Sequence, residues 1–374
     1  LDVSRPFVID PGIEFSTLIG GNLTEMMTCV EVAPDGDIVM AGYVDELDFP
    51  MTPGTYRTPE NLSKGQNMVV TKMDPTLSQL VFSTVIGGHH DDWAQDLEVA
   101  PDGSIYLVGA GNDDFPITAD AFDKDNGNED DAVLVVLSDD GTDLLYSGFI
   151  GGSERELGLD VHLYSDGSVL ILGSTNSSDL YTTPGAFCET YVRTFPMNNP
   201  YVDSLFIAKV RPSLDRLQFL TYINGFSTSS IEAGLASVVV DNSGAIYLAL
   251  TTDWEDFPTK PGDYDPTFNG GTDCGVMKFN PTCSNLIHST YLGGVDVDVP
   301  SDIILDSTGR PWIVGATHSG DFPRTTDAYQ LGLSASGNGF LTVLEPDFSA
   351  INYSTFFGGS LYTAFDSLHL SEDE

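Results

Sequence analysis

The chain has 374 residues, of which 41% are hydrophobic, so it can bury a substantial core and is not disordered by composition. Its 56 acidic residues outnumber the 14 Lys and Arg residues and leave a formal net charge of -42. A surface of that sign repels nucleic-acid phosphates and anionic lipid headgroups, which excludes both as main partners. Two interpretations of the acidity stay open: a saline or cation-rich medium, whose ions screen the self-repulsion, or solubility alone.

Cysteine and hydropathy patterns exclude further classes. The four cysteines form no Cys-x-x-Cys pair and accompany no histidine cluster, so a zinc site is not expected at Cys29, Cys188, Cys274 or Cys283. Cys274 and Cys283 fall at opposite ends of a predicted strand and its turn, too far apart to bridge. No apolar run reaches membrane-spanning length, so no membrane insertion is expected. Leu1 in place of an initiator methionine is consistent with a removed secretion signal.

In chain order, the predicted elements are short strands in a recurring pattern. Residues 6–10 and 14–19 look like the last two strands of an incomplete unit. A complete unit follows, with strands at 29–33, 38–43, 68–73 and within 82–88. The same order recurs four more times, and residues 365–370 look like one further first strand.

Three motifs mark each repeat. An aromatic (once His)-Ser-Thr-x-x-Gly-Gly segment, with some degenerate copies, places second glycines 64 to 73 residues apart at Gly21, Gly88, Gly152, Gly225, Gly294 and Gly359. The turn between the first two strands carries a glycine able to adopt positive φ, at Gly36, Gly103, Gly167, Gly244 and Gly309. The loop between the second and third strands carries Asp-Phe-Pro at 48–50, 114–116, 256–258 and 321–323.

Four short antiparallel strands per repeat predict an all-β fold, a β-propeller of four-stranded blades that stack to bury their faces. Complete blades are predicted at approximately 28–87, 95–151, 159–224, 236–293 and 301–358. A sixth blade, from 6–20 plus 364–374, would be closed by both termini and so remove open sheet edges. Its second strand is missing, so either that blade has three strands or the chain continues beyond Glu374.

The combination of the Ser-Thr-x-x-Gly-Gly anchor, Asp-Asp-Trp at 91–93, Pro-Asp-Gly-x-Ile-Tyr at 101–106 and Asp-Phe-Pro-x-Thr resembles the β-propeller repeat often called the SBBP repeat. The resemblance covers essentially the whole chain. It implies seven blades, as an alternative to the six counted here. It also implies a large secreted or cell-surface protein of bacteria or archaea, without a common enzymatic activity or defined catalytic residues.

The longest predicted loop, about 175–203, is the first candidate binding surface. Long loops on a rigid scaffold commonly carry function, and exposed aromatic side chains favour a protein or glycan partner. The opposing interpretation is that these side chains pack the loop onto its own blade. The candidate residues of this long-loop face are Tyr181, Phe187, Tyr191, Phe195, Tyr201 and Trp254.

Acidic residues suggest a second candidate site. Glu25, Asp92, Glu156 and Asp298 each lie four residues beyond the second glycine of an anchor, and Glu232 lies near the equivalent place. They could line a channel mouth and bind Ca²⁺ through hard oxygen ligands, or each could cap its own turn. Residues 123–131 also partly match a calcium loop through Asp123, Asp125 and Gly127, but lack a bidentate Glu at the required offset. Glu129 is a further candidate ligand there.

Four sequons place candidate glycans at Asn22, Asn61, Asn176 and Asn352. The sequence contains no GxSxG, HExxH, P-loop or dinucleotide motif, and the adjacent His89 and His90 are interpreted as structural or surface residues. We therefore expect a non-enzymatic extracellular propeller that acts as a structural, adhesive or protein-interaction module, within a larger assembly or alone. It would need no cofactor other than a possible Ca²⁺ ion. The alternative is a propeller that binds or cleaves glycans with its long-loop face.

Overall fold

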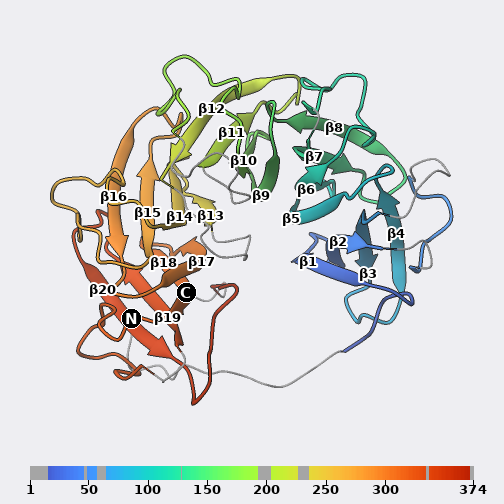
Figure 1. The fold of residues 1–374 in the computed structure, drawn as a ribbon. Coiled ribbons are helices and arrows are strands. Elements are labelled where there is room, and N and C mark those ends of the chain that lie inside the picture. Colours follow the sequence, from blue (N-terminus) through green and yellow to red (C-terminus); the bar gives the residue numbers. More distant parts are fainter. Residues whose placement is uncertain are drawn as a thin grey trace. The chain divides into compact units, whose positions relative to one another are not determined.

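The computed structural model describes residues 16–45, 49–56, 65–127, 129–192, 204–225, 236–333 and 337–370. Every helix or strand assigned in these residues is a strand, and the strands form five four-stranded antiparallel sheets (Figure 1). The chain divides into two compact units, Leu1–Ile150 and Gly151–Glu374. The all-β prediction is confirmed for the described residues.

The first unit contains two sheets whose strands follow one another in chain order. The first sheet comprises β1 (Glu25–Val32), β2 (Ile38–Val44), β3 (Asn67–Met73) and β4 (Leu80–Ile86). The second comprises β5 (Trp93–Val99), β6 (Ile105–Gly111), β7 (Asp131–Leu137) and β8 (Leu144–Ile150). Strand β5 packs against β1, β2 and β3, and one apolar core joins both sheets.

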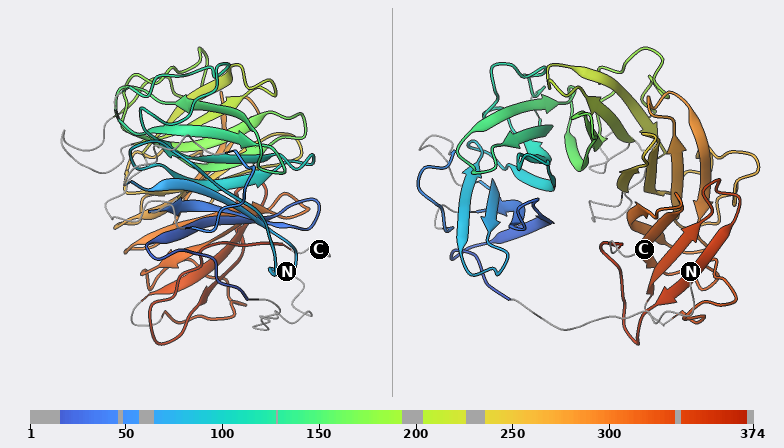
Figure 2. Two further views of the ribbon diagram at one scale, coloured as in Figure 1. Left: turned by 90° about the vertical axis from the view of Figure 1, so that its right-hand side faces the viewer. Right: turned by 180° about the vertical axis from the view of Figure 1, so that it is seen from behind.

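The second unit contains three sheets of the same order, seen from behind in Figure 2. They comprise β9 (Glu156–Leu163), β10 (Val169–Thr175), β11 (Ser204–Val210) and β12 (Leu217–Asn224); β13 (Ala236–Val240), β14 (Ile246–Thr252), β15 (Asp273–Phe279) and β16 (Leu286–Leu292); and β17 (Asp298–Leu305), β18 (Pro311–Thr317), β19 (Asn338–Leu344) and β20 (Ile351–Phe357). Strand β13 contacts β9, and β17 contacts β13, β14 and β15.

The two hairpin turns of each sheet have different chemistry. The turn between the first two strands has positive φ at its predicted glycine in all five sheets, between 78° at Gly309 and 88° at Gly36 and Gly103. The turn between the last two strands uses Gly141 once and otherwise a non-glycine residue at φ 45° to 55°: Leu77, Leu214, Cys283 and Phe348. Cys283 and Phe348 are fully buried there, so the burial of these side chains offsets the cost of the left-handed backbone.

The long loops do not simply project outward; part of each covers the edge strand of its own sheet. In all five sheets a loop N–H donates to a carbonyl of the fourth strand, as Thr52 does to Ser83 at 3.1 Å and Thr325 to Ser354 at 3.1 Å. The threonine of the anchor motif also holds the loop on the edge strand, since the Thr290 hydroxyl donates to the Asp265 carbonyl of the loop at 3.1 Å. The coverage occupies backbone groups that an open edge would offer to another strand.

The Asp-Phe-Pro motifs supply core residues at the ends of the sheets. Phe49, Phe115, Phe257 and Phe322 are each at most 4% exposed. The Phe115 ring fills the space beside Gly111, where an added Cβ would lie 2.8 Å from it. The motif is therefore a packing device, since the aromatic ring closes the core where the loop leaves the second strand.

The prediction of a six-bladed or seven-bladed array is not matched, because the described residues form five sheets. Residues 16–20 and 364–370, assigned to a closing blade, contain no strand; residues 6–15 and 371–374 lie outside the described residues. Segment 364–370 makes no ladder with a second strand. Instead, the Leu368 N–H donates to the Asp302 carboxylate at 2.8 Å, and the Phe365 N–H to the Gly315 carbonyl at 3.5 Å.

Candidate functional site

The acids that follow the Gly-Gly anchors hold the turns that lead into the first strands of four sheets. Each accepts a hydrogen bond from the backbone N–H of the second glycine: Gly21 to Glu25 at 2.6 Å, Gly88 to Asp92 at 2.7 Å, Gly152 to Glu156 at 2.7 Å and Gly294 to Asp298 at 2.7 Å. This is the geometry of a side chain that caps its own turn. Glu232 lies outside the described residues.

A second carboxylate approaches three of these connections from the following long loop. The residue after the glycine pair donates its N–H to Asp114, Asp179 or Asp321, from His89, Ser153 and Val295 respectively. The exposed His89 ring also contacts Asp114, and His90 lies 3.7 Å from Asp113. Each of these three connections is therefore bound by two acids, one four residues after the second glycine and one in the following long loop. Sequence spacing alone did not predict the second acid.

Burial makes several of these acids unusually weak. Burial raises the pKa of Asp92 to about 7 and that of Asp298 to about 6, against the opposing effect of the N–H and hydroxyl groups bonded to them. Burial, and then the nearby charges of Asp298, Asp265 and Asp321, raise the pKa of Asp273 to about 7. These groups lie in the range where a proton is exchanged near neutral pH.

The predicted calcium loop is a tight turn in the structure. The Asp125 N–H donates to Asp123 Oδ1 at 3.2 Å, and the side chains of Asp125 and Glu129 are exposed. Burial raises the pKa of Asp123. Within the described part of the chain, no three His, Cys, Asp or Glu side chains are grouped so that they could hold a metal ion. Calcium binding at these acids, and at the four turn-capping acids, stays a prediction.

The aromatic candidates of the long-loop face do not form one surface. Tyr181 is 77% exposed. By contrast, Phe187 packs edge-on against Phe279 at 5.0 Å between ring centroids, and Tyr191 against Tyr222 at 5.7 Å. Phe195 and Tyr201 lie outside the described residues.

Trp254, the remaining aromatic candidate, lies in another loop and is half-buried. It packs against Gly225, where an added Cβ would lie 2.1 Å from the Trp254 ring. Its carbonyl accepts a hydrogen bond from the Tyr291 hydroxyl at 2.6 Å. Trp254 therefore supports its own sheet, apart from Tyr181.

A shallow cavity of about 310 Å³ lies where the long loop meets the turn after β15. The loop is fixed there because the Phe187 N–H donates to the Cys283 carbonyl at 3.0 Å. Small polar and proline side chains line most of the cavity, and Phe219 is its aromatic lining residue. The lining residues are Thr183, Pro184, Gly185, Ala186, Gln218, Phe219, Pro281, Thr282 and Ser284.

The sequons lie in different environments. Asn22 is exposed and Asn176 is half-buried. Asn352 lies in β20, where its amide donates to Glu345 at 2.8 Å, so a glycan there would have to displace this contact. Asn61 lies outside the described residues.

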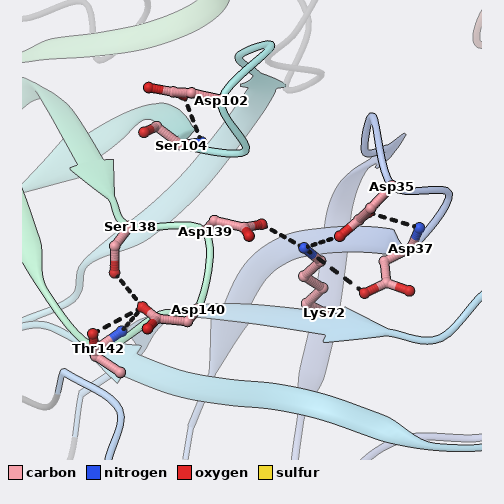
Figure 3. A network of polar contacts seen from close by, with 9 residues as sticks. All are labelled: Asp35, Asp37, Lys72, Asp102, Ser104, Ser138, Asp139, Asp140 and Thr142. Carbon is pink, nitrogen blue, oxygen red and sulfur yellow. Dashed lines mark hydrogen bonds and ion pairs between the residues drawn. The ribbon is translucent and has the colours of Figure 1, made fainter.

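A buried lysine that the sequence analysis did not single out joins the two sheets of the first unit (Figure 3). Lys72 of β3 is 2% exposed, and its Nζ lies 2.8 Å from Asp35 and 2.5 Å from Asp139. Burial acts to lower the lysine pKa, but the contacts with Asp139 and Asp35 outweigh it and raise the pKa. Because the two acids belong to turns of different sheets, only the packed structure brings them together.

Comparisons with known proteins find likeness in structure only. No family model matches the chain, and no curated protein matches it. Similar solved structures include a protein of unknown function from Dyadobacter fermentans (14% identity, TM-score 0.41, 79% of this chain and 72% of that chain). A thermostable family-43 glycoside hydrolase matches at 10% identity and TM-score 0.38, over 92% of this chain and 96% of that chain.

The parainfluenza virus 5 hemagglutinin-neuraminidase ectodomain matches at 10% identity and TM-score 0.39, over 94% of this chain and 76% of that chain. Likenesses this distant carry no argument about function. The resemblance to SBBP repeats stays a prediction. Within the described residues, no helix is long and apolar enough to cross a membrane.

Proposed function

We propose that this chain is a non-enzymatic β-propeller of the SBBP type that acts as a structural, adhesive or protein-interaction module outside the cell. The observation that carries the proposal is the use of the recurring acids: Glu25, Asp92, Glu156 and Asp298 bind the backbone of their own turns. Groups bound in this way stabilise a scaffold, whereas a general acid or base needs access to a substrate.

The covered sheet edges support the same proposal. A loop N–H bonds to the fourth strand in every sheet, and Phe187 and Tyr191 pack inward. Long loops that cover sheet edges are typical of a stable scaffold, and such a scaffold can present its surface to a partner protein or glycan.

A specific observation favours glycan binding or cleavage as the second candidate. Tyr181 is 77% exposed, and its loop continues into the 310 Å³ cavity lined by Thr183 and Phe219. A loop that carries an exposed ring and small hydroxyl side chains is suited to stacking on a sugar and bonding to its hydroxyl groups.

A paired assay separates the two candidates. The purified chain is applied to a glycan array and incubated with cell-wall polysaccharides while released reducing sugar is measured. We expect no turnover. Binding that Tyr181→Ala weakens and Tyr329→Ala, at another exposed tyrosine, leaves unchanged would favour the glycan-binding candidate. Saturable sugar release that Asp321→Asn abolishes, in a variant with an unchanged melting temperature, would overturn the non-enzymatic proposal.

A further inference from the structure

Two buried carboxyl groups of the second unit meet at one glycine. Asp273 begins β15 and Asp298 begins β17, and both side chains are 0% exposed. A Cβ added at Gly293 would lie 2.0 Å from Asp273 Oδ1 and 2.9 Å from Asp298 Oδ2. The two oxygens are therefore no farther apart than the sum of these distances. At such a separation in a dry interior, two ionised carboxylates repel each other strongly.

The hydrogen bonds around the pair leave one buried oxygen of each carboxyl group, Asp273 Oδ1 and Asp298 Oδ1, without a partner. Asp273 Oδ2 accepts the Asn269 N–H at 2.8 Å, but the buried Oδ1 has no hydrogen-bond partner. Asp298 Oδ2 accepts the Gly294 N–H at 2.7 Å and the Ser319 hydroxyl at 2.7 Å. A buried acceptor without a partner costs free energy, unless a proton turns it into a donor.

The surrounding charges favour protonation further. The titratable groups that act on Asp273 are Asp298, Asp265 and Asp321, which are all acidic. The thiol of Cys274 is buried beside the pair, and burial holds its pKa well above the ordinary value, so it stays neutral. Asp298 is likewise faced by Asp321 and by the hydroxyls of Thr317 and Ser319. Among the described residues, the groups with the largest effects on the pKa values of the pair thus include no lysine or arginine.

The first unit contains the same arrangement with one acid replaced by an amide. Asn67 begins β3, and a Cβ added at Gly87 would lie 2.5 Å from Asn67 Oδ1 and 2.7 Å from Asp92 Oδ2. An asparagine side chain is close in shape to a protonated aspartate, and it is neutral at every pH. The comparison indicates that this position accommodates a neutral side chain.

We propose that Asp273 and Asp298 form a proton-binding site that retains one proton between the two carboxyl groups at mildly acidic to neutral pH. The proton comes from solvent and returns to it as the pH rises. When it is lost, two buried negative charges face each other across the junction between sheet β13–β16 and sheet β17–β20. The site therefore ties the junction of these two sheets to the pH of the medium.

The direction of the effect follows from proton linkage. In the folded chain the Asp273 pKa is raised to about 7 from its ordinary value of 3.8. The folded state therefore binds more protons than the unfolded state between these values, so stability falls as the pH rises through this window. Above the folded-state pKa the loss is complete and the dependence becomes flat.

Reciprocal substitutions test the site. Asp273→Asn replaces the acid pair of the second unit by the amide and acid found in the first unit. Asn67→Asp replaces the amide and acid of the first unit by an acid pair. Melting temperatures are measured at pH 5 and pH 8 for the full chain, and Asp296→Asn, at an exposed acid nearby, controls for the removal of one charge. We expect Asp273→Asn to raise the melting temperature at pH 8 by a few degrees and to change it little at pH 5, and Asn67→Asp to lower it mainly at pH 8.

Infrared spectroscopy gives a readout that a purely structural role would not move. We expect a band of a protonated buried carboxyl at pH 6 in the unmodified chain and its weakening in Asp273→Asn. Equal loss of stability at both pH values in Asp273→Asn, with an unchanged band, would overturn the proposal. A calcium effect would also overturn it. If millimolar CaCl₂ raised the melting temperature of the unmodified chain at pH 8 but not that of Asp273→Asn, a cation would occupy the place of the proton.

Discussion

At the scale of single residues, Lys72 and Lys278 occupy corresponding places in their sheets but use different partners. Lys72 of β3 contacts Asp35 and Asp139, whereas the Lys278 ammonium of β15 lies 4.6 Å from the centroid of the Tyr247 ring. The Lys72 ammonium is buried and needs such partners, since desolvation penalises its charge, whereas Lys278 is half-buried. The ion pairs of Lys72 join two sheets, whereas the contact between Lys278 and Tyr247 lies within one sheet.

We expect Lys72→Met to lower the free energy of unfolding by about 2 kcal/mol, because two charge-assisted hydrogen bonds are lost. The loss stays below that of a fully buried pair, since the side chains of Asp35 and Asp139 are 49% and 50% exposed and regain water. Lys278→Met is the matched control, with an expected loss of roughly 0.5–1 kcal/mol. Urea denaturation measures both; an equal loss in the two variants would argue against the ion cluster as the source.

At the scale of elements, a bulge shapes four of the five hairpins formed by the first two strands. The register shifts between Ala94 and Asp96 in β5 and between Pro300 and Asp302 in β17. At the bulge, the backbone of the first strand comes close to a glycine of the second strand. A Cβ added at Gly315 would lie 2.0 Å from the Val299 carbonyl oxygen. These second-strand glycines are therefore required by backbone contact rather than by positive φ.

We expect Gly315→Ala to destabilise the chain by on the order of 3 kcal/mol, because the added Cβ collides with backbone that cannot move without breaking the β17–β18 ladder. Gly320→Ala serves as the control, since no atom lies within 4 Å of its added Cβ. Thermal melts of both variants decide the matter. A melting temperature of Gly315→Ala close to that of Gly320→Ala would mean that the strand relaxes around the methyl group.

The acids at the turns and sheet junctions were only partly predictable from the sequence. The spacing of four residues after each glycine pair identified Asp92 and Asp298, because that interval is local. The role of Asp273 escaped prediction, since it lies 25 residues before Asp298 in the sequence and meets it only when sheet β13–β16 packs against sheet β17–β20. Similarly, the strand pattern of 365–370 predicted a first strand, but a strand requires a paired neighbour, and this segment bonds to Asp302 instead.

At the scale of the whole molecule, the dominant property is the formal net charge of -42. Self-repulsion on this scale opposes the compact state and is reduced by dissolved ions. Most of the recurring acids are bonded to backbone N–H groups or to hydroxyls, which stabilises each charge locally but leaves the total unchanged.

We expect the melting temperature to rise by several degrees between 0.05 M and 1 M NaCl, roughly the range over which the screening length falls from more than 10 Å to about 3 Å. Scanning calorimetry measures the shift. CaCl₂ at matched ionic strength, with a chelator as the blank, separates screening from specific binding at residues 123–131 or at the turn-capping acids. A melting temperature independent of NaCl would show that self-repulsion is not a significant term in the stability.

The sequence by itself determined the strands of the five complete units, their turns and their repetition, because the alternation of apolar residues and the turn glycines act over a few residues. It also located the acids that cap local turns. Only the tertiary structure decided the number of sheets that form, the coverage of edge strands by long loops, the Lys72 cluster and the pairing of Asp273 with Asp298. The physical reason is that these features depend on contacts between residues tens of positions apart, which packing of one sheet on the next creates and local propensity does not encode.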